Sequence, residues 1–300
     1  IMKNKITLYS LFIISIFFNF SCNNDTIITP ETPIDPRITV LDAEPSWSPN
    51  GNFIAYIGSD DKSGNKLLAI DTNGLNKRRL TQIYGESPNI SPNGEWIVYE
   101  RNGKIYKKRI EGDTITIQLT FEGSSFYPSF SRDGEWIAFD SDMDITGGGH
   151  FIWKMRSDGT QKKRIFYTPT LGEARMPEWF PDGIRLVIVR FLPSHGYDSE
   201  VSIIDTSGNS ISVLTNDEDG DYNPKISPDG QYITWWKSVG VSRIYTMKIN
   251  GTEQTQISTR SIHPNWSPDG KMIAYTNTIF DDGRIWIMNK DGSSRKKITY

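Results

Sequence analysis

Residues 261–278 read SIHPNWSPDGKMIAYTNT, a Ser-Pro-Asp-Gly turn between two apolar runs. The same arrangement occurs five more times, as EPSWSPNGNFIAY (44–56), SPNISPNGEWIVY (87–99), YPSFSRDGEWIAF (127–139), MPEWFPDGIRLVI (176–188) and NPKISPDGQYITW (223–235). Self-similarity at a spacing of roughly 40–50 residues is typical of repeat architectures, propellers among them. The chain is therefore built from six copies of one unit.

The composition of each unit predicts four strands. Proline presets φ for the second turn position, Asp or Asn suits the third, and glycine takes a left-handed conformation. A second pair of runs follows, such as RIWIMNKDGSSRKKIT at 284–299. The run after each turn, such as WIVY, is almost continuously apolar, which favours a sheet covered on both faces. The sequence thus predicts an all-β fold, a six-bladed β-propeller of four-stranded antiparallel blades.

The pattern W-S-P-D-G…I-A-Y…I-W-x-M…D-G…I-T resembles the WD-like repeat of TolB-type β-propellers. The resemblance covers residues 37–300, with units starting near residues 44, 87, 127, 176, 223 and 263. It rests on turn and core positions, so it implies the fold rather than the function. The α/β domain that precedes the propeller in TolB is expected to be missing, and the transport role of TolB is not carried over.

The N-terminal 36 residues are predicted to be a targeting segment and a linker. Lys3 and Lys5 precede an apolar run to Phe20, which has the form of a secretory signal over residues 1–21. The single cysteine, Cys22, follows Ser21 and resembles the lipidated cysteine of the bacterial lipobox, although Asn19 replaces the usual aliphatic residue. An ordinary signal peptide with an incidental cysteine is the alternative. Residues 22–36 contain three prolines and are predicted to be an extended tether.

This resemblance implies a lipid-anchored protein of the cell envelope. Asn23 follows the cysteine where inner-membrane lipoproteins carry aspartate, so the family rule implies the outer membrane. The formal net charge of -3 gives no basic footprint for nucleic acid. The basic runs at 77–79, 162–164 and 295–297 are interpreted as solvated outer strands. Residues 37–40 resemble an outer strand and are expected to pack against the last blade.

A functional site is expected on the propeller face that carries the second-to-third loops and the inter-blade connections. These segments vary in length, whereas the turns of the opposite face are uniform, and binding residues concentrate in variable loops. The variable segments are 59–65, 140–149, 167–175, 191–200, 216–222 and 276–283. The candidate binding residues are Tyr84, Glu86, Phe126, Tyr167, Glu173, Arg175, His195, Tyr197, Asp198, Tyr222, Arg260 and His263.

Metal and catalytic signals are sparse. His150, His195 and His263 all fall in or beside these segments, and three imidazoles on one channel would suit a divalent metal, as in the histidine-rich site of oligogalacturonate lyases. Residues 217–221, Asp-Glu-Asp-Gly-Asp, half-resemble a calcium loop but lack the bidentate glutamate. Hydrolase, metalloprotease and Walker motifs do not occur. We therefore expect no catalytic residues and no cofactor.

The sequence favours a monomeric, non-catalytic envelope lipoprotein that binds a protein or a glycan through its variable face. The first alternative is a carbohydrate-active lyase or hydrolase with a metal-assisted site at the channel mouth. The second is a purely structural subunit of an envelope complex. Aromatic rings beside arginine and carboxylates suit either a peptide or a sugar.

Overall fold

The computed structural model describes residues 41–59, 64–112, 115–144, 149–166, 172–192, 198–207, 211–278 and 283–300. All of them belong to one compact unit, Thr39–Tyr300. The other unit, Ile1–Ile38, lies outside the described residues, as do Cys22 and the expected outer-strand segment at 37–40. No helix long and apolar enough to cross a membrane occurs in the described part of the chain.

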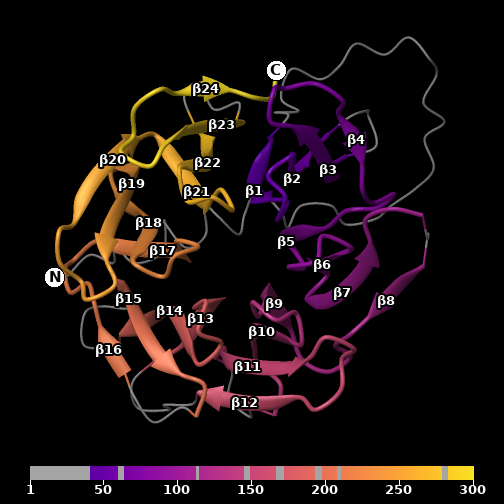
Figure 1. Ribbon diagram of the computed structural model, residues 1–300. Coiled ribbons are helices and arrows are strands. Elements are labelled where there is room, and N and C mark those ends of the chain that lie inside the picture. Colours follow the sequence, from indigo (N-terminus) through magenta and orange to yellow (C-terminus); the bar gives the residue numbers. More distant parts are fainter. Residues whose placement is uncertain are drawn as a thin grey trace, which may run out of the picture. The chain divides into compact units, whose positions relative to one another are not determined.

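Six four-stranded antiparallel sheets follow one another in chain order and form the predicted ring of blades (Figure 1). The first three blades contain β1 (Ala43–Trp47), β2 (Phe53–Gly58), β3 (Lys66–Asp71), β4 (Arg78–Arg79), β5 (Glu86–Ile90), β6 (Trp96–Arg101), β7 (Lys104–Arg109), β8 (Thr116–Gln118), β9 (Ser125–Phe130), β10 (Trp136–Ser141), β11 (Phe151–Arg156) and β12 (Lys163–Phe166).

The last three blades contain β13 (Ala174–Trp179), β14 (Arg185–Leu192), β15 (Asp198–Asp205), β16 (Ile211–Val213), β17 (Gly220–Ile226), β18 (Tyr232–Val239), β19 (Val241–Lys248), β20 (Thr255–Thr259), β21 (Ser261–Trp266), β22 (Met272–Asn277), β23 (Arg284–Asn289) and β24 (Lys296–Lys297). The first strand of each blade lies at the centre and the fourth at the rim (Figure 1). The basic runs lie on or beside the rim strands β4, β12 and β24, which confirms their interpretation as solvated outer strands.

The repeated turn joins the first and second strands of each blade. In blade 2, the Gly94 amide donates to the Ser91 carbonyl at 2.8 Å, and Gly94 has a φ of 74°. The Ser91 hydroxyl donates to Asn93 Oδ1 at 2.6 Å and accepts from the Trp96 amide at 2.9 Å. Blade 4 has Phe180 in place of the serine, and there Asp182 accepts from the backbone amides of Ile184 and Arg185.

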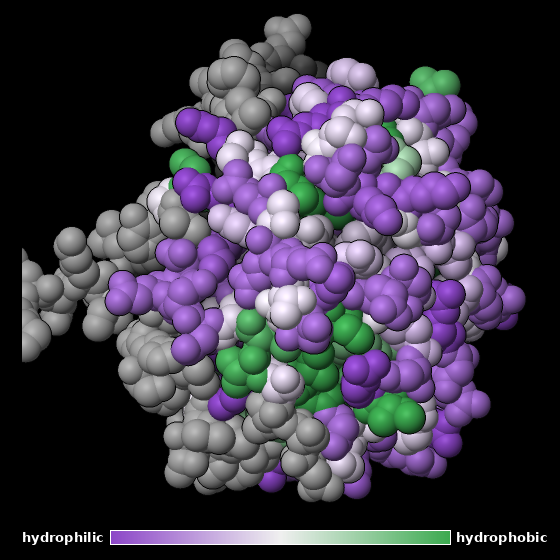
Figure 2. Space-filling view, turned by 60° about the vertical axis from the view of Figure 1, so that its left-hand side comes forward, coloured by the Kyte–Doolittle hydropathy of each residue, from purple (hydrophilic) through white to green (hydrophobic). Residues whose placement is uncertain are grey.

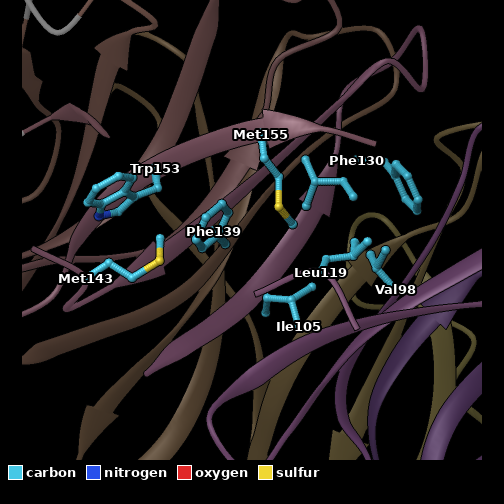
Figure 3. Packing of buried hydrophobic residues seen from close by; sticks show 9 residues of the cluster. Val98, Ile105, Leu119, Phe130, Phe139, Met143, Trp153 and Met155 are labelled. Atoms are coloured by element: carbon cyan, nitrogen blue, oxygen red, sulfur yellow. The ribbon is translucent and has the colours of Figure 1, made fainter. Parts of the chain in front are cut away.

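The core consists of six hydrophobic clusters, one between each pair of neighbouring blades. Both faces of each second strand are buried, as the continuous apolar runs predict. Figure 3 shows the cluster between blades 2 and 3, where Phe139 lies near Met143, Trp153 and Met155. Figure 2 shows one side of the molecule, which is mostly hydrophilic, with a larger hydrophobic area in the lower middle and several smaller ones.

Blade 6 meets blade 1 through packing and hydrogen bonds. Ile54 and Tyr56 of blade 1 share a cluster with Ile285 and Ile298 of blade 6. The Asp42 amide donates to the Gly283 carbonyl at 3.1 Å. In the described residues the last blade draws all four of its strands from the C-terminal part of the chain.

Candidate binding face at the channel mouth

The residue before proline on each innermost strand lines the central channel. Between the first and second strands of every blade the register shifts at this point, which marks a β-bulge. The bulge residue has a φ of 49–56° in all six blades. A positive φ in a non-glycine residue costs of order 1–3 kcal/mol, and such residues cluster at functional sites. The six are Glu44, Ser87, Tyr127, Met176, Asn223 and His263, and together they surround a small cavity of about 40 Å³ in the central channel.

Arg175 is the centre of a polar group between blades 3 and 4. Its Nε lies 3.5 Å from Oδ1 of Asp140, and the same oxygen lies 3.0 Å from Nδ1 of His150. The Phe126 ring lies 5.6 Å from the guanidinium carbon and 5.3 Å from the His150 ring, measured to ring centroids. The Asp140 side chain is fully buried, whereas those of His150 and Arg175 are 16% and 24% exposed. We call Phe126, Asp140, His150 and Arg175 the Arg175 group.

Electrostatics keep this arginine charged despite its burial. Burial opposes the charge, but Asp140, Tyr127 and Glu173 together raise the pKa of Arg175 above its ordinary value. Tyr127 lies beside the same guanidinium, with its ring centroid 5.9 Å from the guanidinium carbon of Arg175. Burial raises the pKa of the Tyr127 hydroxyl, so this group is a neutral hydrogen-bond donor at neutral pH. The mouth here presents a cation flanked by neutral rings.

Carboxyl groups gather at blades 1 and 2. Glu86 and Glu100 are cross-strand partners on β5 and β6. Burial, followed by Glu44 and Glu100, raises the pKa of Glu86, and burial also raises that of Glu100. Glu44 accepts a hydrogen bond from the Ser87 amide at 2.6 Å. The raised pKa of about 9 leaves the Glu86 carboxyl protonated at neutral pH, so this part of the mouth offers hydrogen-bonding carboxyl groups rather than a concentrated negative charge.

Blades 5 and 6 contribute aromatic rings that are already stacked. Tyr222 packs on Trp236 with centroids 4.6 Å apart, and His263 meets Trp236 edge-on at 6.2 Å. Burial, with Lys225 as a further cause and against the pull of Glu44, lowers the pKa of His263. This imidazole is therefore neutral at neutral pH and unsuited to bind an anion by charge.

The structure places the predicted residues unevenly. It brings Phe126, Glu173 and Arg175 together, and it joins Tyr222 to His263 through Trp236. Tyr84 lies half-buried in the connection between blades 1 and 2, and Arg260 is exposed in the connection between blades 5 and 6. Tyr167, His195 and Tyr197 lie outside the described residues, and the side chain of Asp198 is not described.

Residues 217–221, which partly resemble a calcium loop, belong to an ion-paired cluster rather than to an open acidic loop. Lys237 Nζ lies 2.5 Å from Asp217 Oδ2 and 3.7 Å from Asp221 Oδ1. Trp235 Nε1 donates to Asp221 at 2.8 Å, and burial raises the pKa of Asp221 to about 7. The lysine ammonium thus takes the place a bound cation would need. Across the described part of the chain, no three His, Cys, Asp or Glu side chains are grouped to hold a metal.

The variable segment predicted at 140–149 begins at Asp140, which was not a candidate although its carboxylate faces both His150 and Arg175. Asp140 is in fact a residue of β10, opposite Phe126 on β9. Glu100 and Trp236 occupy the equivalent positions on β6 and β18. An acidic residue at the end of an apolar run, as in WIAFD and WIVYE, is the sequence signal that indicates Asp140 and Glu100.

Comparison with known proteins assigns the fold to a family. Residues 86–260, more than half of the chain, match the TolB beta propeller domain, and the chain belongs to that family. It is 25% identical over 243 residues to the Tol-Pal system protein TolB of Francisella tularensis, covering 75% of this chain and 54% of that protein. It is 26% identical over 187 residues to an uncharacterized protein of Agrobacterium fabrum, covering 55% and 61%. The chain thus spans little more than half the length of these two relatives.

Solved structures agree on the fold. TolB from Acinetobacter baumannii has a TM-score of 0.70 at 22% identity, covering 82% of this chain and 63% of that one. An oligogalacturonate lyase in complex with manganese has a TM-score of 0.60 at 12% identity, covering 87% and 77%. At these identities the likeness shows the fold alone, because one fold carries many functions.

Proposed function

We propose that this TolB-type propeller is a cell-envelope protein that binds a protein partner, without catalysis, through the mouth formed by its variable face. The observation that carries the proposal is the Arg175 group. It combines a partly open guanidinium with aromatic rings on a rigid scaffold, and arginine and aromatic residues dominate the energetics of protein interfaces. The relationship to a protein named for the Tol-Pal system supports the envelope assignment.

The aromatic rings favour a protein over a glycan. Sugar binding by stacking needs an open ring face, but the Arg175 guanidinium lies over the Phe126 ring, and Tyr222 packs on Trp236. Among the described residues no observation favours the enzymatic alternative. The proposed molecule is a monomer, and its partner is neither a nucleic acid nor a free sugar.

Cross-linking from two positions in one blade tests the binding face. A photoreactive phenylalanine analogue at Tyr84 lies on the variable face, and the same group at Glu95 lies exposed beside the opposite turn. In intact cells we expect a discrete cross-linked protein from Tyr84 and none from Glu95. Equal cross-linking from both positions would contradict a face-specific partner. A partner that stays bound when the mouth residues are replaced would indicate the purely structural subunit instead.

We further propose that Cys22 is lipidated and anchors the protein, through the tether at 22–36, in the outer membrane. The support is the sequence alone, where Cys22 closes an apolar segment of signal-peptide form. Cys22→Ser is expected to move the protein from the outer-membrane fraction to the soluble fraction. Mass spectrometry should find acyl chains on the wild-type N-terminal cysteine, and an unmodified Cys22 in the membrane-bound protein would refute the anchor.

A further inference from the structure

We infer that the Arg175 group is a carboxylate-recognition site, which takes an acidic group from a peptide segment of the bound partner. This inference rests on the proposed function and deepens it by naming the chemistry of the ligand. Three observations carry it: the surplus charge on Asp140, the open edge of Arg175 and the covered aromatic rings beside it.

Asp140 carries a charge that its structural role does not require. Its Oδ2 accepts a hydrogen bond from the Met176 amide at 3.1 Å, which ties blade 4 to blade 3. At the equivalent position in blade 6, Thr276 Oγ1 accepts from the Glu44 amide at 3.2 Å and ties blade 1 to blade 6. A neutral hydroxyl therefore suffices for this inter-blade bond. The negative charge of the buried Asp140 acts instead on His150 and Arg175, which its other oxygen faces.

The contacts of Arg175 leave its two terminal guanidinium nitrogens available to a ligand. Asp140 is reached through Nε, and in the described residues no protein acceptor is within hydrogen-bonding distance of the two terminal nitrogens. A guanidinium presents those two nitrogens as a planar pair that matches the two oxygens of a carboxylate. With Nδ1 of His150 beside Asp140, the opposite ring nitrogen Nε2 points away from that carboxylate.

The surroundings select a single carboxylate from a peptide. Sugar acids also carry a carboxylate, but they gain their binding energy by stacking on open aromatic faces. The Arg175 guanidinium already lies over the Phe126 ring, and His150 contacts the same ring at a tilt, which leaves less of it for stacking on a sugar.

Saturation-transfer NMR with short blocked peptides tests the inference on the full mature protein. The probes are acetyl-Gly-Gly-Asp-Gly-Gly-amide, its Asn counterpart, acetyl-Gly-Gly-Gly with a free C-terminal carboxylate, and galacturonate. We expect the Asp or the C-terminal probe to bind, which separates the two sources of carboxylate, and the Asn probe to bind at least 10-fold more weakly. Arg175→Gln should weaken binding of the acidic probe at least 10-fold, whereas Arg132→Gln, at an exposed arginine in the turn of the opposite face, should change it less than 2-fold.

Thermal melting of both variants confirms that they are folded, and Arg175→Lys, which keeps the charge but loses the planar pair, should recover only part of the affinity. Binding of galacturonate alone, equal binding of the Asp and Asn probes, or no effect of Arg175→Gln would each overturn the inference. A failure of this test while Tyr84 still cross-links a protein would leave the proposed function standing. Carboxylate binding without any cross-linked partner would support the carboxylate site and contradict the proposed function.

Discussion

Phe139→Ala is expected to lower the free energy of unfolding by about 3–5 kcal/mol, because it removes a fully buried ring and leaves a cavity. Phe139 has no exposed surface and packs between blades 2 and 3 with Ile105, Leu119 and Trp153 (Figure 3). In the absence of disulfides among described residues, such inter-blade clusters hold the ring together. Urea denaturation of the purified propeller measures the loss.

Phe121→Ala is the matched control, since the same chemical change is made at a ring that is 68% exposed. This variant should remain within about 0.5 kcal/mol of the wild type. A comparable loss in both variants would show that the clusters between blades do not limit stability. A loss confined to one partial transition would show that the blades unfold independently.

Lys237→Met is expected to destabilise the protein by about 3–5 kcal/mol at pH 8.5, because it leaves the buried Asp221 carboxylate without its cation. Lys237 is 6% exposed and Asp221 is fully buried. Burial raises the pKa of Asp221 to about 7, well above its value of about 3.9 in an unfolded chain. The folded state therefore binds more protons than the unfolded state between about pH 4 and pH 7, and this group's contribution to stability falls as the pH rises through that window.

The effect of Lys237→Met should accordingly shrink at pH 5, where a protonated Asp221 needs no cation. The double variant with Asp221→Asn should recover most of the loss at pH 8.5, because the second change removes the buried charge. Lys248→Met serves as the control, since Lys248 pairs with Glu253 on the surface and its loss should be small. A loss of the same size at pH 5 and pH 8.5 would mean that Lys237 acts through packing alone.

The sequence was sufficient to predict the ring because the informative residues are local. Proline, Asp or Asn, and glycine determine each first turn, and the apolar second strands require burial on both faces. Both features are confirmed at Gly94 and along β6. The position of His263, variable between units in its chemistry, lines the channel and holds a different residue type in each of the six blades.

The site was only partly predictable because its geometry depends on contacts between blades. Arg175 was a candidate from its place in a variable segment, but its partner Asp140 belongs to a strand in the previous blade, 35 residues earlier. The bulge before each proline also escaped prediction, since a residue before proline usually adopts extended backbone. The six bulge residues with positive φ come together only in the folded ring, where the six innermost strands surround one channel.

The affinity of the purified partner for wild-type, Arg175→Gln and Arg132→Gln proteins tests most directly whether the Arg175 group is the binding site. A charge-assisted hydrogen bond contributes about 1.5–3 kcal/mol, so its loss corresponds to a factor of about 10–100 in Kd. We predict that Arg175→Gln raises Kd by about that factor and that Arg132→Gln, on the opposite face, leaves it nearly unchanged. Equal affinity of all three proteins would contradict the account.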